Sequence, residues 1–240
     1  AVHFIVFRNK MLSPYVKDAE VRTYGLVFLL ASLFVAFSLY LSHAYGTVLE
    51  SLRYAAFQVA SVLTSTGFGT ATFASWPLHI PLIMVILSFT GGCAGSTAGG
   101  VKVMRVMLLA KLGLRQLFHL AHPRAVVVVK QGERAVSEEV LYSVWGFYVL
   151  YVVVSLFLTV AMMAAGLDLE SAFGTVVATI NLLGPGLGEV AVNFVSVNDV
   201  VKWLGVFGML AGRLEIFTLL ILLIPVYFFF KQKTAYEIAW

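Results

Sequence analysis

The pattern of apolar and polar positions divides the chain into two regular spans and two interrupted ones. Residues 24–42 and 140–165 run without a charge for about the 20 residues that a bilayer core requires. Residues 81–120 are equally apolar but contain a glycine run, and residues 200–230 contain glycines and two charges. We therefore expect the first pair to be ordinary membrane-spanning helices and the second pair to be broken or specialised spans.

A shorter apolar segment lies between the members of each pair. Residues 52–65 and 169–181 are each roughly 13–14 residues long, which is too short to cross a bilayer. Each is followed by a glycine-bearing turn, TSTGFG at 64–69 and NLLGPG at 181–186. This arrangement predicts re-entrant half-helices that enter the membrane and turn back.

The spacing of these features indicates an internal repeat. Gly67 in the first turn lies 24 residues before Gly91, and Gly184 in the second turn lies 24 residues before Gly208. Both halves therefore follow one plan of span, half-helix, glycine turn and specialised span.

Composition and charge agree with a membrane protein and give it an orientation. The chain is 60% hydrophobic and 12% charged, against about 45–50% and about 25% in soluble domains. Of the 16 Lys and Arg residues, 13 precede the first span, separate the halves or follow the last span, so this side is assigned to the cytoplasm. The opposite face is acidic, and its acidic residues are Glu50, Asp168, Glu170, Glu189 and Asp199. These residues either concentrate cations at the outer entrance or belong to ordinary solvated loops.

The two turns place irregular backbone at membrane depth, which is tolerated only where protein or a water-filled cavity satisfies it. Glycines such as Gly67 and Gly69 can take positive φ, so that successive carbonyls point along one axis and replace the water around an ion. Pro185 stiffens the second turn. A tight hairpin that binds no ion is the alternative.

Several stretches together resemble one family. TSTGFG resembles the TTVGYG of potassium-channel filters, and the wider set is similar to the Trk/Ktr/HKT potassium transporter superfamily, in particular its bacterial TrkH-like subunits. The supporting stretches are TSTGFGTATFASWP, GGCAGSTAGGVKVMR, HPRAVVVVK, NLLGPGLGEV and MLAGRLEIFTLLILL. They extend over residues 22–225, and the combination is far more specific than any one of them.

The resemblance implies a pore of four repeats, of which this chain carries the third and fourth. The expected fold is an all-α integral membrane protein with two repeats of span, re-entrant half-helix with filter loop, and span. The expected divisions are a cytoplasmic lead-in (1–23), a repeat with a broken second span (24–120), a cytoplasmic linker (121–139), a second repeat (140–230) and a tail (231–240). The tail does not resemble the end of the family's chains, and a non-native origin is one interpretation of it.

The resemblance also implies potassium uptake through a selectivity filter, with potassium as substrate and no cofactor. The family's recurrent filter glycine maps to Gly67 and Gly184. The expected filter residues are Thr64, Ser65, Thr66, Gly67, Phe68, Asn181, Leu182, Leu183 and Gly184. The alternative is a non-conducting membrane scaffold or assembly subunit in which the half-helices merely pack.

The glycine run GGCAGSTAGG should break its span, because glycine costs about 1 kcal/mol per helical position relative to alanine. A nucleotide-phosphate loop is disfavoured, since Lys102 is followed by Val103 and GxxxxGK[ST] is absent. Close helix packing through small residues is one interpretation, and the family's intramembrane gating loop is the other. The expected gate residues are Gly91, Gly92, Gly95, Ser96, Gly99 and Gly100.

Arg213 and Glu215 lie within the last apolar region, where an unpaired charge costs at least about 2.5–3.5 kcal/mol. Each should therefore face protein or water. Interhelical anchoring explains them as well as a functional role does. The resemblance implies that Arg213 approaches the pore below the filter as a barrier to cations.

The remaining expectations concern partners, place and chemistry. The resemblance implies a bacterial inner-membrane protein that crosses the bilayer several times, with the N-terminal half of the pore, a second copy in a homodimer, a cytoplasmic nucleotide-binding regulatory subunit and lipid as partners. No nucleic acid is expected to bind, and no enzyme activity is expected. The histidines have no Cys or carboxylate at metal-ligand spacing, so potassium is the only metal expected.

Overall fold

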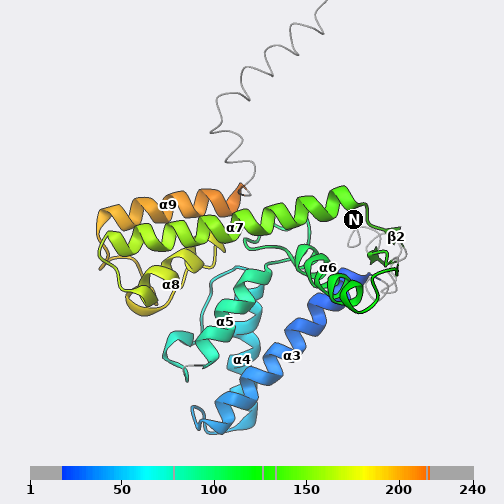
Figure 1. Cartoon of the computed structure of the whole chain (residues 1–240). Coiled ribbons are helices and arrows are strands. Elements are labelled where there is room, and N and C mark those ends of the chain that lie inside the picture. Colours follow the sequence, from blue (N-terminus) through cyan, green and yellow to red (C-terminus); the bar gives the residue numbers. More distant parts are fainter. Residues whose placement is uncertain (1–17, 78, 126, 133, 215, 217–240) are drawn as a thin grey trace, which may run out of the picture.

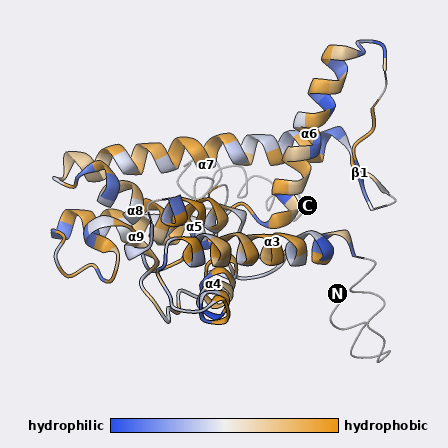
Figure 2. Ribbon diagram, turned by 90° about the horizontal axis from the view of Figure 1, so that it is seen from below, coloured by the Kyte–Doolittle hydropathy of each residue, from blue (hydrophilic) through white to orange (hydrophobic). Residues whose placement is uncertain are grey.

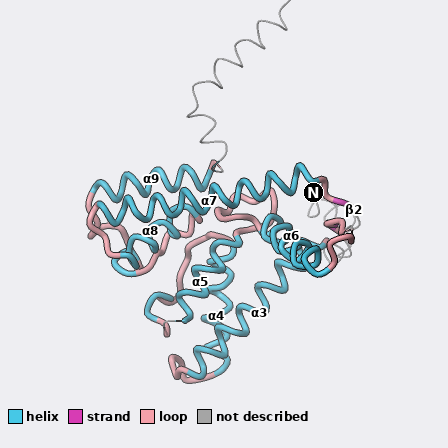
Figure 3. Tube along the Cα trace, viewed as in Figure 1, coloured by secondary structure: helices cyan, strands magenta, loops and turns pink. Residues whose placement is uncertain are grey.

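The computed structural model describes residues 18–77, 79–125, 127–132, 134–214 and 216, and this part of the chain is mainly helical (Figures 1 and 3). The helices are α3 (Ala19–Leu41), α4 (Val48–Leu63), α5 (His79–Thr90), α6 (Val103–Ala121), α7 (Glu138–Ala164), α8 (Leu169–Ile180) and α9 (Asp199–Arg213). Two single-turn 3₁₀ helices, Phe73–Ser75 and Gly188–Val190, follow the two glycine turns.

Several helices begin before the apolar pattern does, because polar side chains cap their first turns. Asp18 accepts hydrogen bonds from the backbone N–H groups of Glu20 and Val21, so α3 begins at Ala19 rather than at residue 24. Thr47 accepts one from the N–H of Glu50, so α4 begins at Val48. Such caps satisfy orphan N–H groups and contribute roughly 1 kcal/mol each.

The helices form two clusters. α3, α4 and α5 pack together in one, and α7, α8 and α9 pack together in the other (Figure 1). The core of the first cluster includes Val35, Leu39, Val59, Leu63, Ile80 and Met84. The core of the second includes Tyr151, Leu158, Met162, Val176, Ile180 and Val201. α5 also contacts α8, so the clusters meet at the ends of these short helices.

Within the described part, α3 and α7 are the two helices long and apolar enough to cross a membrane. Both carry large apolar side chains on exposed faces, including Leu30, Phe37, Phe157 and Val160. Their hydrophobic colouring runs along nearly their whole length (Figure 2). Such faces suit contact with lipid or with further protein rather than with water.

The segment between α6 and α7 contains an antiparallel hairpin, β1 (Lys130–Gln131) with β2 (Arg134–Ala135). The chain is mainly helical, as expected for an all-α protein, and this small hairpin was not predicted from the sequence. The strands are two residues long, too short for an alternating pattern to be read from the sequence. Gly132, at a φ of 58°, supplies the left-handed turn residue that this tight connection requires.

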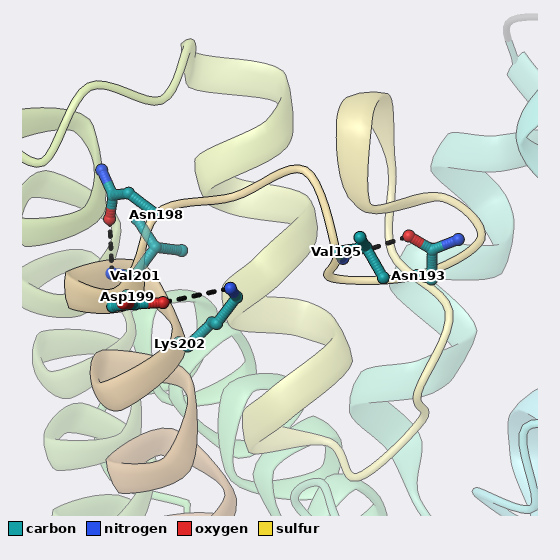
Figure 4. A network of polar contacts seen from close by, with 6 residues as sticks. All are labelled: Asn193, Val195, Asn198, Asp199, Val201 and Lys202. Carbon is teal, nitrogen blue, oxygen red and sulfur yellow. Dashed lines mark hydrogen bonds and ion pairs between the residues drawn. The ribbon is translucent and has the colours of Figure 1, made fainter.

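Polar contacts within the first turn of α9 (Figure 4), together with one bond to the end of α7, fix where this helix begins. The side-chain oxygen of Asn198 accepts a hydrogen bond from the N–H of Val201, and its amide nitrogen donates to the carbonyl of Ala165 at 2.6 Å. Asp199 and Lys202 form an ion pair in the first turn of α9. This loop therefore sets where α9 enters the second cluster.

Candidate functional site

The two predicted filter turns begin with the same backbone geometry. The N–H of Thr66 bonds to the carbonyl of Ser61, and the N–H of Leu183 bonds to the carbonyl of Ala178, each at 3.0 Å. This six-residue closure ends a helix with one residue in the left-handed conformation. Glycine usually fills that position, but here it is Ser65 at a φ of 53° and Leu182 at 55°.

A second left-handed residue follows two positions later in each turn, and both times it is glycine. Gly67 has a φ of 71° and Gly184 has a φ of 92°. Two positive φ values within three residues redirect the backbone sharply after each short helix. Non-glycine residues adopt such angles at a cost of order 1–3 kcal/mol and only where their surroundings hold them there.

The structure brings the two turns into direct contact. A methyl group added to Gly67 would lie 2.2 Å from the carbonyl oxygen of Leu183 and 3.5 Å from Cδ of Pro185. No side chain fits in that space, so main chain packs on main chain. Gly184, in contrast, has open space around the position of a Cβ.

The predicted filter residues differ in exposure. Phe68 is 74% exposed, and Thr64 and Thr66 are also exposed. The hydroxyl of Ser65 is buried, and among the described residues it has no hydrogen-bond partner. The second turn is more enclosed, since Asn181 and Leu183 are both buried.

The first turn is held mainly by its own helix. Thr64 Oγ1 donates to the carbonyl of Ala60 at 2.7 Å. Gln58, buried in α4, donates from its side-chain amide to the carbonyl of Ala71, beyond the turn. Gln58 was not predicted as a site residue, although a long amide in the middle of a short apolar segment is the kind of signal that marks one.

The second turn is held by other helices. The hydroxyl of Tyr151 in α7 donates to the side-chain oxygen of Asn181, and the amide nitrogen of Asn181 donates to Ser88 in α5 at 2.8 Å. Neither Tyr151 nor Ser88 was predicted from the sequence. Tyr151 lies in a regular apolar span where nothing in the pattern distinguishes it from a lipid-facing residue.

The glycine run interrupts the helix as expected, because α5 ends at Thr90 and α6 begins at Val103. The run folds back on itself, with the N–H of Val101 bonded to the carbonyl of Phe89 at 2.9 Å. It also packs against the second turn. A methyl group on Gly99 would lie 2.3 Å from the carbonyl oxygen of Asn181. The loop therefore touches the predicted filter through bare backbone.

Charged side chains hold this loop from three directions. Lys102 Nζ donates to the carbonyls of Ser96 and Ala98 at 2.6 and 2.7 Å. Arg213 donates to the intervening carbonyl, that of Thr97, at 2.7 Å. From α3, the carboxylate of Glu20 accepts a hydrogen bond from the N–H of Ala94. Lys102 and Glu20 had not been assigned a role from the sequence.

A cavity of about 240 Å³ lies between the loop and the ends of the neighbouring helices. Its lining includes Thr97, Lys102, Tyr151, Ile180 and Arg213. Two cationic side chains thus border one small space beside the glycine run. A positive lining of this kind opposes the entry of cations.

The glycines of the last apolar region serve close helix packing. A methyl group on Gly208 would lie 2.8 Å from Thr179 Oγ1, and one on Gly212 would lie 2.0 Å from the carbonyl oxygen of Ile180. α9 therefore approaches the end of α8 as closely as small residues permit. Arg213 is the last residue of α9. Glu215 lies outside the described residues.

An acidic side chain, Asp168, lies directly before the first residue of α8. Asp168 caps the helix and accepts hydrogen bonds from the N–H groups of Glu170 and Ser171. Hydrogen bonding from Ser171, through its side chain and then its backbone, lowers the pKa of the Asp168 carboxyl below its usual value. The side chain therefore stays negatively charged at neutral pH.

Comparison with known proteins identifies the family of the chain. Residues 9–231 match the TrkH family, described as "Cation transport protein". The Trk system potassium uptake protein TrkH of Salmonella typhimurium is 45% identical over 226 residues, which cover 94% of this chain and 47% of that protein. TrkG of Escherichia coli is 36% identical over 222 residues, 91% of this chain and 45% of that protein.

A solved structure agrees with the sequence relatives. The crystal structure of the potassium transporter TrkH from Vibrio parahaemolyticus superposes with a TM-score of 0.89 at 45% identity, covering 94% of this chain and 49% of that one. The chain thus belongs to a class of membrane cation transport proteins. Its family is TrkH. The chain spans about half the length of the curated relatives it matches.

Proposed function

We propose that this chain supplies two of the strands that line a potassium selectivity filter. The observation that carries the proposal is the contact between the two turns, in which Gly67 packs against the carbonyl of Leu183. Two short helices from different halves of the chain end in the same way and deliver their turns to one place. The Ser65 hydroxyl in the first turn, which has no hydrogen-bond partner within the described part of the chain, is a further oxygen that supports a polar role for this turn.

The chemistry of the turns suits a bare cation. A potassium ion leaves water only where oxygens replace its hydration shell, and successive backbone carbonyls do this without bringing a charge. The curated relatives are named potassium uptake proteins, which supports potassium as the transported substrate. The residues proposed to line the filter are Thr64, Ser65, Thr66, Gly67, Phe68, Asn181, Leu182, Leu183 and Gly184.

We further propose that the glycine run gates the pathway. The run packs against the Asn181 carbonyl, where it would obstruct the pore next to the filter. Its glycines give the backbone of the run the conformational freedom to move away. Arg213 supports the closed arrangement in two ways. It binds the loop at Thr97, and its charge borders the cavity beside the loop.

The working protein requires more than this chain. We propose that the half of the relatives that lies outside the match supplies the other two repeats, since two strands cannot surround an ion. A homodimer in the bacterial inner membrane and a nucleotide-binding regulatory subunit on the cytoplasmic face complete the proposal. α6 is suited to transmit regulation, because it follows the glycine run directly and carries basic residues such as Arg115.

Potassium flux into liposomes tests the filter. A full-length protein containing this sequence is compared with its Gly67→Val and Gly184→Val variants, and Gly113→Val, whose added Cβ meets open space, serves as the control. We expect both turn variants to lose most of the flux while the control keeps it. Unaltered flux in both turn variants would instead favour the scaffold alternative.

A further inference from the structure

Three buried polar side chains, two from the helices α7 and α5 and one from the residue that directly follows α8, form one hydrogen-bonded chain at the second turn. Tyr151 in α7 donates to Asn181, Asn181 donates to Ser88 in α5, and Ser88 donates to the carbonyl of Val85 at 2.6 Å. Asn181 and Ser88 are completely buried and Tyr151 is 4% exposed. Both ends of the Asn181 amide are therefore bound inside the protein.

The first turn has no equivalent among the described residues. Thr64, which occupies the same position at the end of α4, is exposed and bonds to its own helix. Ser88 lies 93 residues before Asn181 in the sequence and belongs to the other helix cluster. The second turn is consequently fixed by groups from both halves of the chain, whereas the first is fixed locally.

The same residues also contact the glycine run. The Asn181 carbonyl faces Gly99, and the Ser88 carbonyl lies 2.9 Å from the position of a methyl group on Gly100. Asn181 thus joins its turn, through its side chain, to the helix that leads into the run and touches the run itself through its main chain.

We propose that Tyr151 and Ser88 are positioning residues that act through Asn181 to hold the second turn in the conformation that selects potassium. This inference rests on the proposed filter function. An amide bound as acceptor on one side and donor on the other has one allowed orientation. The backbone of Asn181, and with it the left-handed Leu182, is therefore set by the two hydroxyl groups.

Removing one hydroxyl leaves the Asn181 amide with an unpaired buried group, which is costly in a low-dielectric interior. Tyr151→Phe and Ser88→Ala each do this without removing much volume. Thr159→Val is the matched control, because Thr159 is a buried hydroxyl on the same helix as Tyr151 and, among the residues that the structure describes, bonds only within that helix, to Ser155. All are made in a full-length protein that contains this sequence.

Two measurements separate positioning from general stability. The first is the potassium-to-sodium permeability ratio in liposomes, which we expect to fall about five-fold or more in Tyr151→Phe and Ser88→Ala. The second is amide hydrogen exchange at residues 181–184, which we expect to accelerate by a similar factor. Thr159→Val should leave both near the parent value. Because both hydroxyls act on one amide, the double variant should change the ratio by less than the product of the single effects.

Each outcome of these measurements either supports or overturns the positioning role of Tyr151 and Ser88. An unchanged ratio in both folded variants would overturn the positioning role, even if their melting temperatures fell. Equal changes in Thr159→Val would attribute the effect to packing and overturn it too. A parent that shows no selective potassium flux would refute the proposed function and with it the role in selectivity. In that case faster exchange at 181–184 in the variants would still support positioning, and unchanged exchange would refute it.

Discussion

Gly99→Ala is the substitution that most directly tests whether the glycine run obstructs the pathway. Gly99 has no positive φ, so alanine fits its backbone, and the only conflict is steric. The added methyl carbon would lie 2.3 Å from the Asn181 carbonyl oxygen, whereas ordinary contacts begin at 3.4 Å. The loop and the second turn must therefore separate by roughly 1 Å, a displacement characteristic of overpacking.

The size of the effect follows from that conflict. Overpacking typically costs about 1–3 kcal/mol, and each 1.4 kcal/mol is about ten-fold in an equilibrium. If the seated loop is the closed state, Gly99→Ala should favour the unseated state by about five- to 150-fold. Potassium flux should rise accordingly until the open state predominates.

Flux into liposomes, measured for Gly99→Ala, the parent and Gly113→Ala, checks this expectation. Gly113 lies in α6 with open space around it, so its substitution adds the same methyl group without a clash. Flux should rise in Gly99→Ala alone. A folded Gly99→Ala protein whose flux equals or falls below that of the parent would refute the view that the seated loop closes the path.

Other predictions follow from the contacts of the loop and of α8. Arg213→Gln should raise potassium flux about ten-fold, because it removes a positive charge beside the cavity, and a barrier lowered by about 1.4 kcal/mol is crossed about ten times faster; unchanged flux and selectivity would contradict the barrier role. Lys102→Met should accelerate amide exchange in the loop, since two carbonyls lose their donor; protection equal to that of the parent would count against this. Because the pKa of Asp168 is lowered in the folded protein, its stabilising effect is present above the unfolded-state pKa of about 3.9 and is lost as pH falls through the lower folded pKa. Acidification should therefore reduce the melting temperature of the parent more than that of Asp168→Asn. Equal losses in the two proteins would refute this stabilising role of Asp168.

Hydropathy was enough to locate the helices, because their apolar runs are long and punctuated by glycines and charges. The ends of the helices were less predictable. Caps such as Asp18 extend α3 beyond its apolar part, and the sequence pattern carries no length signal for them. The hairpin at residues 130–135 was missed because strands of two residues show no periodicity.

At the candidate site, the positions of the two glycine turns could be predicted from the sequence, but the residues that hydrogen-bond to the second turn could not. Glycines at two matching places identified the segments at Gly67 and Gly184, since few other residues permit the backbone that such turns need. The partners of Asn181 could not be found in this way. Tyr151 and Ser88 are ordinary residues of apolar helices, and only the three-dimensional packing of α5, α7 and α8 brings them to one amide.

The bond between Arg213 and Thr97 has a consequence for biosynthesis. It joins residues 116 positions apart, and the arginine is translated after the segment it binds. At about 5–20 residues per second, the ribosome adds Arg213 roughly 6–23 seconds after Thr97. During that interval the nascent chain lacks the hydrogen bond from Arg213 to its glycine segment. All the hydrogen bonds described for this segment can therefore form only after α9, the last described helix, has been synthesised.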